Sequence, residues 1–427
     1  MLELTTLIAA LTTLLLLNFF FSRDVRYPAV LQIIVWLVTL VVYVVERHRY
    51  VSLSESVMLI IFLGVLGFSA GSFLTLSSLG GRSLGSRKTV LLRMRHLSDV
   101  RLVLAFFLTL LAIAGAAVYI QTATQFAQTG PTQDLALNLR YLTSVRGEVP
   151  PLMRLTSYAL PILNTLSGFC LIYYRANRDK RVLPILFLAV ASALVMSVFS
   201  TGRGIILFFI IEMGIIYAMT SKRLRLRLVL LGLLMFLSIF YIGASVLGKG
   251  VDQNASLLES FPDLFSSISL YLLSGILALS VQLPTLVTDE GGVNTFRTIH
   301  ALGRALGFDA TVVPLVQAFT NIPQPTNVYT IYLTYLKDFG WLGIFIFQFL
   351  FGILHATLFI AFRRTGGAVA LFWLAILSFP LLTQPFTDGY FSLMSTWIQY
   401  AFFSSLFSLT IFRSSSKASS ATDVSRA

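Results

Sequence analysis

The sequence predicts an all-α protein that crosses a lipid bilayer about eleven times, and three observations indicate this. Hydrophobic residues make up 56% of the 427 residues and charged residues only 11%, whereas soluble domains carry about 25% charge. The apolar residues come in runs of about 17–25, long enough for a helix to cross roughly 30 Å of hydrocarbon. Basic residues concentrate in alternate connections between these runs. Lipid cannot hydrogen-bond exposed backbone groups, so the runs are expected to be helical.

The predicted spans follow one another along most of the chain. They are residues 4–20, 28–45, 56–76, 102–120, 155–174, 182–199, 204–220, 228–247, 339–362, 368–382 and 390–412. A twelfth apolar stretch, 267–283, is ambiguous. If it were a span, Arg363 and Arg364 would lie on the side opposite to the other basic connections. We therefore expect 267–283 to be an interfacial or re-entrant helix.

The charge pattern predicts an orientation. The alternate connections that hold 23–26, 82–101, 175–181, 222–227, 363–364 and the tail contain 21 of the 31 Lys and Arg residues but about 4 of the 18 acids. Short cytoplasmic connections carry this positive excess, so the N-terminus is expected outside and the C-terminus inside. The net charge of +13 is therefore a topology signal, and no nucleic-acid partner is expected.

The remaining composition narrows the class of protein. One cysteine, Cys170, excludes a disulfide framework, and the four histidines are scattered without a zinc spacing. No metal or other cofactor is expected. Residues 1–413 are predicted to form a single membrane domain, and the Ser- and Ala-rich residues 414–427 a disordered cytoplasmic tail. Gly67–Gly71 matches the G-x-S-x-G pattern of hydrolases, but it lies within a span without a preceding strand. Gly64, Gly67 and Gly71 are instead expected to pack helices closely.

Two outer connections, 121–154 and 248–338, are too long for simple turns and are expected to be functional. Within the second, Asn294 is predicted to cap a helix over 295–306 that ends at Gly307. One stripe of this helix holds Arg297, His300 and Arg304. The opposite stripe holds Ile299, Leu302 and Leu306, which we expect to pack on the bundle. The polar stripe is either a solvated face or a site for a diphosphate, which matches arginine's forked donors.

Two charged residues near or within spans are further candidates. Arg203 lies between Gly202 and Gly204 at the start of a span, where it either anchors the helix at the interface or contacts a ligand. Glu212 lies nine residues further on, about 13 Å deeper and half a turn away, so the two are not expected to pair. His355 or another helix is its expected neighbour.

Several short motifs resemble those of bacterial oligosaccharide repeat-unit polymerases, the Wzy-type polymerases of O-antigen and capsule. They are Arg-Asp-Val-Arg-Tyr-Pro (23–28), Ser-Thr-Gly-Arg-Gly (200–204), Leu-Tyr-Leu-Leu-Ser-Gly (270–275), Thr-Asn-Val-Tyr-Thr (326–330) and Asp-Phe-Gly-Trp-Leu-Gly (338–343). The resemblance covers most of the chain and rests on the order and spacing of these motifs. The sequence departs from such families at 277–280, where Leu-Ala-Leu-Ser stands in place of an acidic residue.

The resemblance implies a glycosyltransferase of GT-C-like architecture in the bacterial inner membrane, with its active site facing the periplasm. Its substrates would be undecaprenyl-diphosphate-linked glycans, and its partners a chain-length regulator and a flippase of the same pathway. A diphosphate leaving group requires positive charge, for which the sequence offers Arg140, Arg203, Arg297 and Arg304. His300 or Asp338 would accept the proton of the acceptor hydroxyl. Asn327, Tyr329 and Trp341 would contact sugars, or else belong to the aromatic belt at the interface.

Three other functions remain open on the sequence alone. A ligase that moves a finished glycan to another acceptor would use similar chemistry. A flippase or exporter would be expected to carry charged residues along a central path, whereas Glu212 is almost alone within the spans. A structural membrane protein would tolerate substitution of every arginine in the outer loop.

Overall fold

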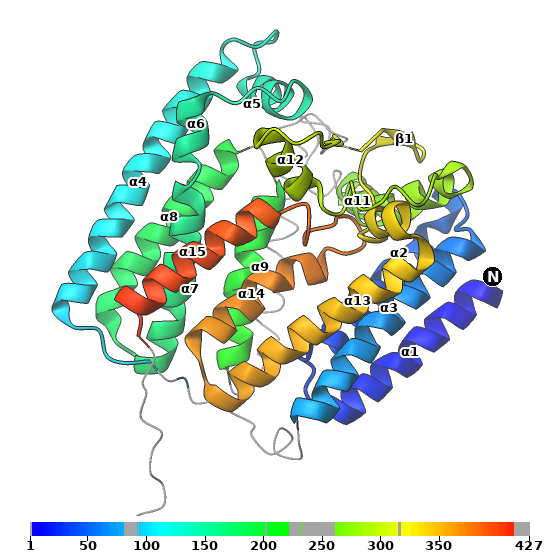
Figure 1. The fold of residues 1–427 in the computed structure, drawn as a ribbon, viewed down its shortest axis with the longest axis horizontal. Coiled ribbons are helices and arrows are strands. Elements are labelled where there is room, and N and C mark those ends of the chain that lie inside the picture. The colour runs from blue at the N-terminus through cyan, green and yellow to red at the C-terminus, as the bar shows by residue number, and fades with distance from the viewer. Residues whose placement is uncertain are drawn as a thin grey trace, which may run out of the picture.

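The computed structural model describes residues 2–80, 92, 94–200, 203–221, 232, 261–314 and 317–413. In these residues it is all-α apart from one small two-stranded antiparallel sheet (Figure 1). The α-helices are α1 (Leu2–Ser22), α2 (Pro28–Glu46), α3 (Glu55–Thr75), α4 (Asp99–Ala127), α5 (Leu135–Arg140), α6 (Pro151–Thr156), α7 (Ala159–Asn177), α8 (Leu183–Phe199), α9 (Arg203–Thr220), α11 (Phe261–Gln282), α12 (Arg297–Ala305), α13 (Tyr332–Thr365), α14 (Ala368–Leu382) and α15 (Met394–Thr410). The strands are β1 (Thr320–Asn321) and β2 (Pro325–Thr326). Short 3-10 or π turns are Arg47–Arg49, Leu76–Gly80, Tyr141–Val145, Lys180–Val182 and Leu283–Thr285.

Eight helices of the described residues are long and apolar enough to cross a membrane, so the chain is a multi-pass membrane protein by helix length and hydropathy. The predicted spans outside 228–247 all overlap helices of the structure. The predicted span 228–247 lies outside the described residues, apart from residue 232, as does the predicted disordered tail 414–427. The predicted span 155–174 corresponds to two helices, α6 and α7, separated by a turn at Ser157 and Tyr158.

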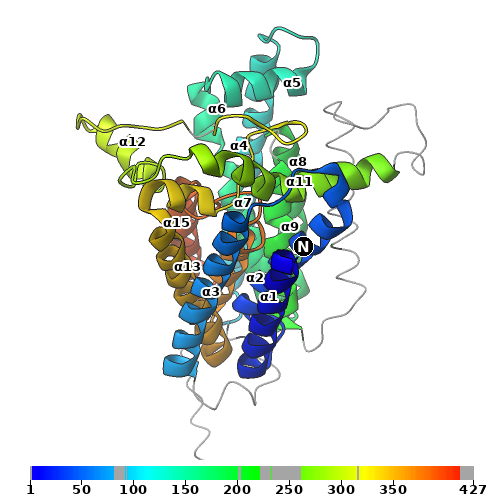
Figure 2. The same ribbon diagram turned by 90° about the vertical axis from the view of Figure 1, so that its right-hand side faces the viewer.

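The ambiguous stretch 267–283 lies in α11, which is long and apolar enough to be a span. Figure 2 shows it running crosswise to the long helices, at the same end of the bundle as α12 and the small sheet. Two serine contacts attach it to the connection between α2 and α3: Tyr50 to Ser269 (3.3 Å between hydroxyl oxygens) and the Ser54 amide to the Ser280 hydroxyl (2.8 Å). This position matches the expectation of an interfacial helix.

The helix pair α3–α13 is packed backbone to backbone. A Cβ added at Gly71 of α3 would overlap the carbonyl oxygen of Phe349, and one at Gly352 of α13 would overlap the carbonyl oxygen of Phe68. A Cβ at Gly67 would lie 2.7 Å from the carbonyl oxygen of Phe345. The expectation that these glycines serve helix packing is confirmed. Small residues allow such close approach in lipid, where dispersion contacts must replace the hydrophobic effect between helices.

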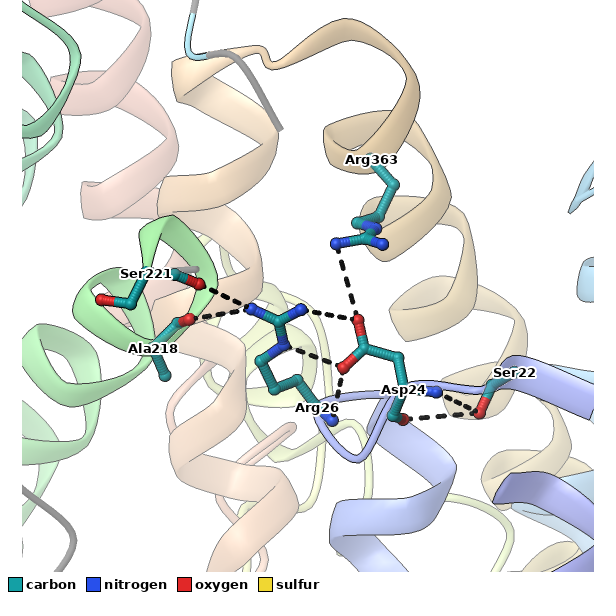
Figure 3. Close-up of polar contacts among 6 residues, drawn as sticks. All are labelled: Ser22, Asp24, Arg26, Ala218, Ser221 and Arg363. Carbon is teal, nitrogen blue, oxygen red and sulfur yellow. Dashed lines mark hydrogen bonds and ion pairs between the residues drawn. The ribbon is translucent and has the colours of Figure 1, made fainter. Parts of the chain in front are cut away.

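The end of the bundle opposite α11 and α12 is held by arginines (Figure 3). Arg26 binds both carboxylate oxygens of Asp24 (2.8 and 3.0 Å) and donates to the carbonyl oxygens of Ala218 and Ser221 at the end of α9 (3.1 and 3.2 Å). Arg363 of α13 lies 3.5 Å from the other side of Asp24. The carbonyls of the last turn of a helix lack intrahelical partners, and cations are favoured there. The motif at 23–28 thus joins α1, α9 and α13 at one end.

Replacing Gly71 by Ala is expected to destabilise the protein by about 1–3 kcal/mol, because the added Cβ forces α3 and α13 apart. Gly214→Ala in α9 is the matched control, since no heavy atom lies within 4 Å of its added Cβ. There, Ala should leave stability unchanged or raise it by up to about 1 kcal/mol through helix propensity. Thermal unfolding of both purified variants in detergent measures this. Equal melting temperatures for the two variants would contradict the packing argument.

Candidate functional site

A cavity of about 650 Å³ lies between α7, α9, α11, α13, α14 and α15. It lies toward the end of the bundle that carries α11 and the sheet, because the loop before α13 and the connection between α14 and α15 both contribute to its wall. Its polar lining includes the amides Asn164, Gln317, Asn327 and Gln399 and the carboxyl group of Asp388. Its aromatic lining comprises Phe208, Tyr271, Tyr329, Phe379, Phe386 and Tyr400. Such a mixture of flat apolar faces and a few polar groups is typical of a small-molecule site.

Asp388 is the only acidic residue among the described residues that line this cavity. Its Oδ1 accepts hydrogen bonds from the Tyr335 hydroxyl (3.1 Å) and from the backbone amides of Tyr390 (3.0 Å) and Phe391 (3.4 Å). Among the residues that the structure describes, no hydrogen bond of ordinary geometry reaches its Oδ2, although the Ser392 amide lies near enough to the carboxyl group to lower its pKa. One carboxylate oxygen is therefore fixed by the protein, and the other remains available to a ligand.

Burial raises the pKa of Asp388 to about 6, and hydrogen bonds from the Tyr390 amide and the Tyr335 hydroxyl oppose this rise. A carboxyl group with a pKa near 6 is mostly ionised at neutral pH and still basic enough to accept a proton from a reacting hydroxyl. General bases work best when their pKa lies close to the operating pH. Asp388 thus has both the geometry and the proton affinity of a base.

The connection that carries Asp388 is fixed by direct backbone packing. A Cβ at Gly275 of α11 would overlap the carbonyl oxygen of Pro385 and lie 2.9 Å from the amide nitrogen of Thr330. The amide of Ile331 donates to the carbonyl oxygen of Gln384 (3.0 Å). The motif 270–275 therefore brings α11 against both the loop before α13 and the connection after α14. These contacts hold Asn327 and Asp388 on one cavity.

Two of the predicted sugar-contacting residues line the cavity, Asn327 and Tyr329. The Tyr329 hydroxyl is already engaged by Gln282, by Thr320 (2.8 Å) and by the carbonyl oxygen of Ala318 (2.9 Å). Its ring, and not its hydroxyl, is therefore the part that a ligand would contact. Arg203 begins α9 directly before Gly204, which also lines the cavity; the Arg203 side chain lies outside what the structure describes.

The other predicted site residues do not line this cavity; they are Arg140, Arg297, His300, Arg304, Asp338 and Trp341. Arg140 ends α5 and is exposed. Arg297 donates from Nε to the carbonyl oxygen of Val313 (2.7 Å). Trp341 is 41% exposed on the far side of a kink at Gly340, which has φ +60°. Arg140, Arg297 and Arg304 thus lie outside the lining of this cavity, and the binding of a diphosphate by the four arginines stays a prediction.

The carboxyl group of Asp338 accepts hydrogen bonds from residues just before α12. It is 2% exposed, and its Oδ1 accepts from the Asn294 amide (3.2 Å) and side chain (2.8 Å), while its Oδ2 accepts from the Thr295 amide (2.5 Å). The prediction that Asn294 caps α12 is wrong, because its side chain donates to Glu290 and Asp338 instead. The stop at Gly307 is confirmed, since Gly307 has φ +92° directly after the helix. Asp338 therefore orders the start of α12, and its role as a proton acceptor stays a prediction.

The prediction that the apolar face of α12 packs on the bundle is also wrong. Ile299, Leu302 and Leu306 are 55%, 60% and 68% exposed. Figure 2 shows α12 at the edge of the bundle, beside the ends of the long helices. An amphipathic helix at a membrane surface can direct its apolar face to lipid, so apolar residues there need not be buried in protein.

Sequence reasoning missed Asp388, because the residues between two apolar runs were treated as a short connection. The available signal was a lone acid beside Gly389 and Tyr390 in that connection. It also expected His355 or another helix as the neighbour of Glu212. The His355 Nε2 lies 2.8 Å from the Tyr390 hydroxyl, and Glu212 packs against Gly168 of another helix, α7. Comparison of the chain with protein-family models, with curated proteins and with solved structures finds no match.

Substitution Asp338→Ala is expected to speed amide hydrogen exchange in residues 290–300, because three donors lose their acceptor. Each such loss in a buried site costs about 1–3 kcal/mol, or roughly a tenfold rise in exchange or more. Asp388→Ala is the matched control and should leave 290–300 unchanged. Exchange measured by mass spectrometry on both variants decides this, and unchanged protection in Asp338→Ala would refute the structural role.

Proposed function

We propose that this protein is a glycosyltransferase that polymerises lipid-diphosphate-linked oligosaccharide repeat units at the outer face of the bacterial cytoplasmic membrane. The observation that carries the proposal is a cavity lined by the carboxyl group of Asp388 together with amides and aromatic rings. The proposal also draws support from the motif resemblance. It replaces His300 and Asp338 by Asp388 as the group that accepts the proton.

The lining suits carbohydrate. Sugar rings present C–H faces that pack on aromatic side chains, because tyrosine and phenylalanine rings are large, flat and apolar. Hydroxyl groups both donate and accept hydrogen bonds, which matches the paired donor and acceptor of Asn327 and Gln399. A volume of about 650 Å³ lies within the range of about 300–1,000 Å³ for small-ligand sites, enough for a few sugar residues of a longer chain.

The proposed reaction is a substitution at an anomeric carbon. The Asp388 carboxylate accepts the proton of an acceptor hydroxyl on one lipid-linked repeat unit. The oxygen of that hydroxyl forms a bond to the anomeric carbon of the growing glycan. The bond between this carbon and its diphosphate breaks, and the electron pair leaves with the diphosphate of the lipid carrier. Positioning both substrates and supplying the base account for the rate gain.

The departing diphosphate needs nearby positive charge, because charge develops on its oxygens as the bond breaks. Among the predicted arginines, Arg203 is the one whose chain neighbour, Gly204, belongs to the cavity wall. We assign the diphosphate contact to Arg203 first. Arg140, Arg297 and Arg304 would act at a greater distance, through attraction of an anionic substrate toward this end of the bundle.

Asp388→Asn is expected to lower the polymerisation rate by about 10²–10⁴, the usual contribution of a general base. The assay uses purified full-length protein with lipid-linked repeat units, and product length is read on gels. Glu148→Gln is the control, since Glu148 is 55% exposed in the outer loop and outside the cavity. Wild-type product from Asp388→Asn would remove the basis of the proposal.

The wild-type rate should also fall with pH. Because only ionised Asp388 accepts a proton, and burial raises its pKa to about 6, activity should be full well above pH 6 and decline about tenfold per unit below it. A rate that stays constant from pH 8 to about 5 would exclude Asp388 as the base.

A strain that lacks the protein distinguishes the candidate functions. Loss of long glycan with a single unit still delivered supports a polymerase, and loss of the single unit as well supports a ligase or flippase.

Arg203→Ala is expected to remove polymer formation, and Arg203→Lys to restore part of it, since lysine keeps the charge but not the forked donors. Arg146→Ala is the matched control, because Arg146 is 55% exposed and pairs with Glu148 in the outer loop. Membrane expression of each variant is checked by immunoblot. Full-length glycan from Arg203→Ala would show that Arg203 only anchors its helix.

A further inference from the structure

Glu212 lies within α9 and is completely buried. Neither of its carboxyl oxygens has a hydrogen-bond partner in the described part of the chain, and none of the ion pairs found there includes it. An ionised carboxylate in such a place costs several kcal/mol or more. An acid within a span that pairs with nothing calls for a functional explanation.

The neighbouring helix α7 is shaped around this carboxyl group. The Oε1 of Glu212 lies 2.6 Å from the point where a Cβ on Gly168 would stand, so only glycine leaves room for it. Asn164 lies one turn earlier on the same face of α7, since residues four apart are neighbours on a helix. Asn164 is 1% exposed, and its Oδ1 also lacks a donor.

Asn164 connects this region to the cavity. Its Nδ2 donates to the Tyr400 hydroxyl (2.9 Å), and both Asn164 and Tyr400 line the cavity. Glu212 is close enough to Tyr400 for an electrostatic interaction. Phe208, one turn before Glu212, stacks on the Tyr400 ring with 5.5 Å between the ring centroids. On Glu212 and Asn164, the buried atoms that lack partners in the described residues are three acceptors, Oε1 and Oε2 of Glu212 and Oδ1 of Asn164.

We propose that Glu212 is a protonated carboxylic acid that donates to Asn164 Oδ1 and so positions the Asn164–Tyr400 pair at the cavity wall. A single proton removes the charge and supplies the missing donor. The amide of Asn164 is then fixed with its nitrogen toward Tyr400. The Tyr400 oxygen accepts from Asn164, which leaves the Tyr400 O–H to donate into the cavity.

The consequence for a ligand rests on the proposed function: Tyr400 would donate to a sugar oxygen, and Glu212 would act through Asn164 as a positioning residue. The protonation itself does not depend on that function. Glu212→Gln distinguishes a protonated acid from an ionised carboxylate, because glutamine is neutral, has nearly the same shape and keeps a donor. If Glu212 instead held a metal cation as a carboxylate, Glu212→Gln would lose the site.

The first experiment is infrared spectroscopy of the purified full-length protein, wild type minus Glu212→Gln, at a pH well above 6 where Asp388 is ionised. We expect the difference to contain the C=O stretch of a protonated carboxyl group. Asn164→Leu should shift that band, because it removes the acceptor. A difference that contains carboxylate bands instead would overturn the proposal.

The second experiment measures polymerisation with lipid-linked repeat units. Glu212→Gln should stay within about threefold of wild type, whereas Glu212→Leu and Asn164→Leu should each lose about tenfold, as expected for one buried hydrogen bond. The double Leu variant should be no slower than either single variant, because both remove the same contact. Equal loss in Glu212→Gln and Glu212→Leu, with normal melting temperatures, would refute a neutral donor. Failure of the whole assay with an intact infrared band would count against the proposed function alone.

Discussion

Polar groups within an apolar bundle must find partners inside the protein, because lipid offers none. The structure meets this constraint by joining helices that are far apart in sequence. Gln384, after α14, accepts from Gln32 (2.9 Å) and Trp36 (3.2 Å) of α2 and donates to Gln348 of α13 (3.2 Å). At the basic end, Arg26 and Arg175 bind the last carbonyls of α9. These contacts fix which helices are neighbours more specifically than apolar surfaces could.

The same constraint gives the candidate site its character. Asp388 follows Gln384 by four residues, so the segment that joins α2 and α13 in the core also delivers a carboxyl group to the cavity. Tyr335 and two backbone amides satisfy one oxygen and leave the other. Glu212 and Asn164, deeper in the bundle, show the opposite situation, in which acceptors without donors imply a retained proton. The proposed base and the proposed positioning group, both carboxyl groups, thus differ in the residues that surround them.

The helices α11 and α12, at the end of the bundle opposite the arginines, differ from helices of soluble proteins in where their apolar residues lie. α11 is apolar enough for a span but lies across the bundle, and α12 directs Ile299 and Leu302 outward. Both are consistent with the membrane interface, where one face of a helix meets lipid and the other meets protein or water. Burial in protein is therefore a poor guide to which face of such a helix is apolar, and Asp338, not an apolar contact, fixes the start of α12.

The sequence by itself determined the membrane class, the helical spans and the end of the bundle that carries the basic residues, because apolar run length and Lys and Arg placement are local properties. It also placed Asn327 and Tyr329 in a loop that reaches the cavity. Only the tertiary structure distinguishes the surroundings of Asp338 from those of Asp388, since both are single acids near helix ends and the donors around each come from distant parts of the chain. It likewise shows that His355 contacts Tyr390 and that Glu212 has no hydrogen-bond partner among the described residues. Hydrogen-bond partners separated by tens or hundreds of residues leave no periodic signal in a chain, so they become visible only when the helices are packed.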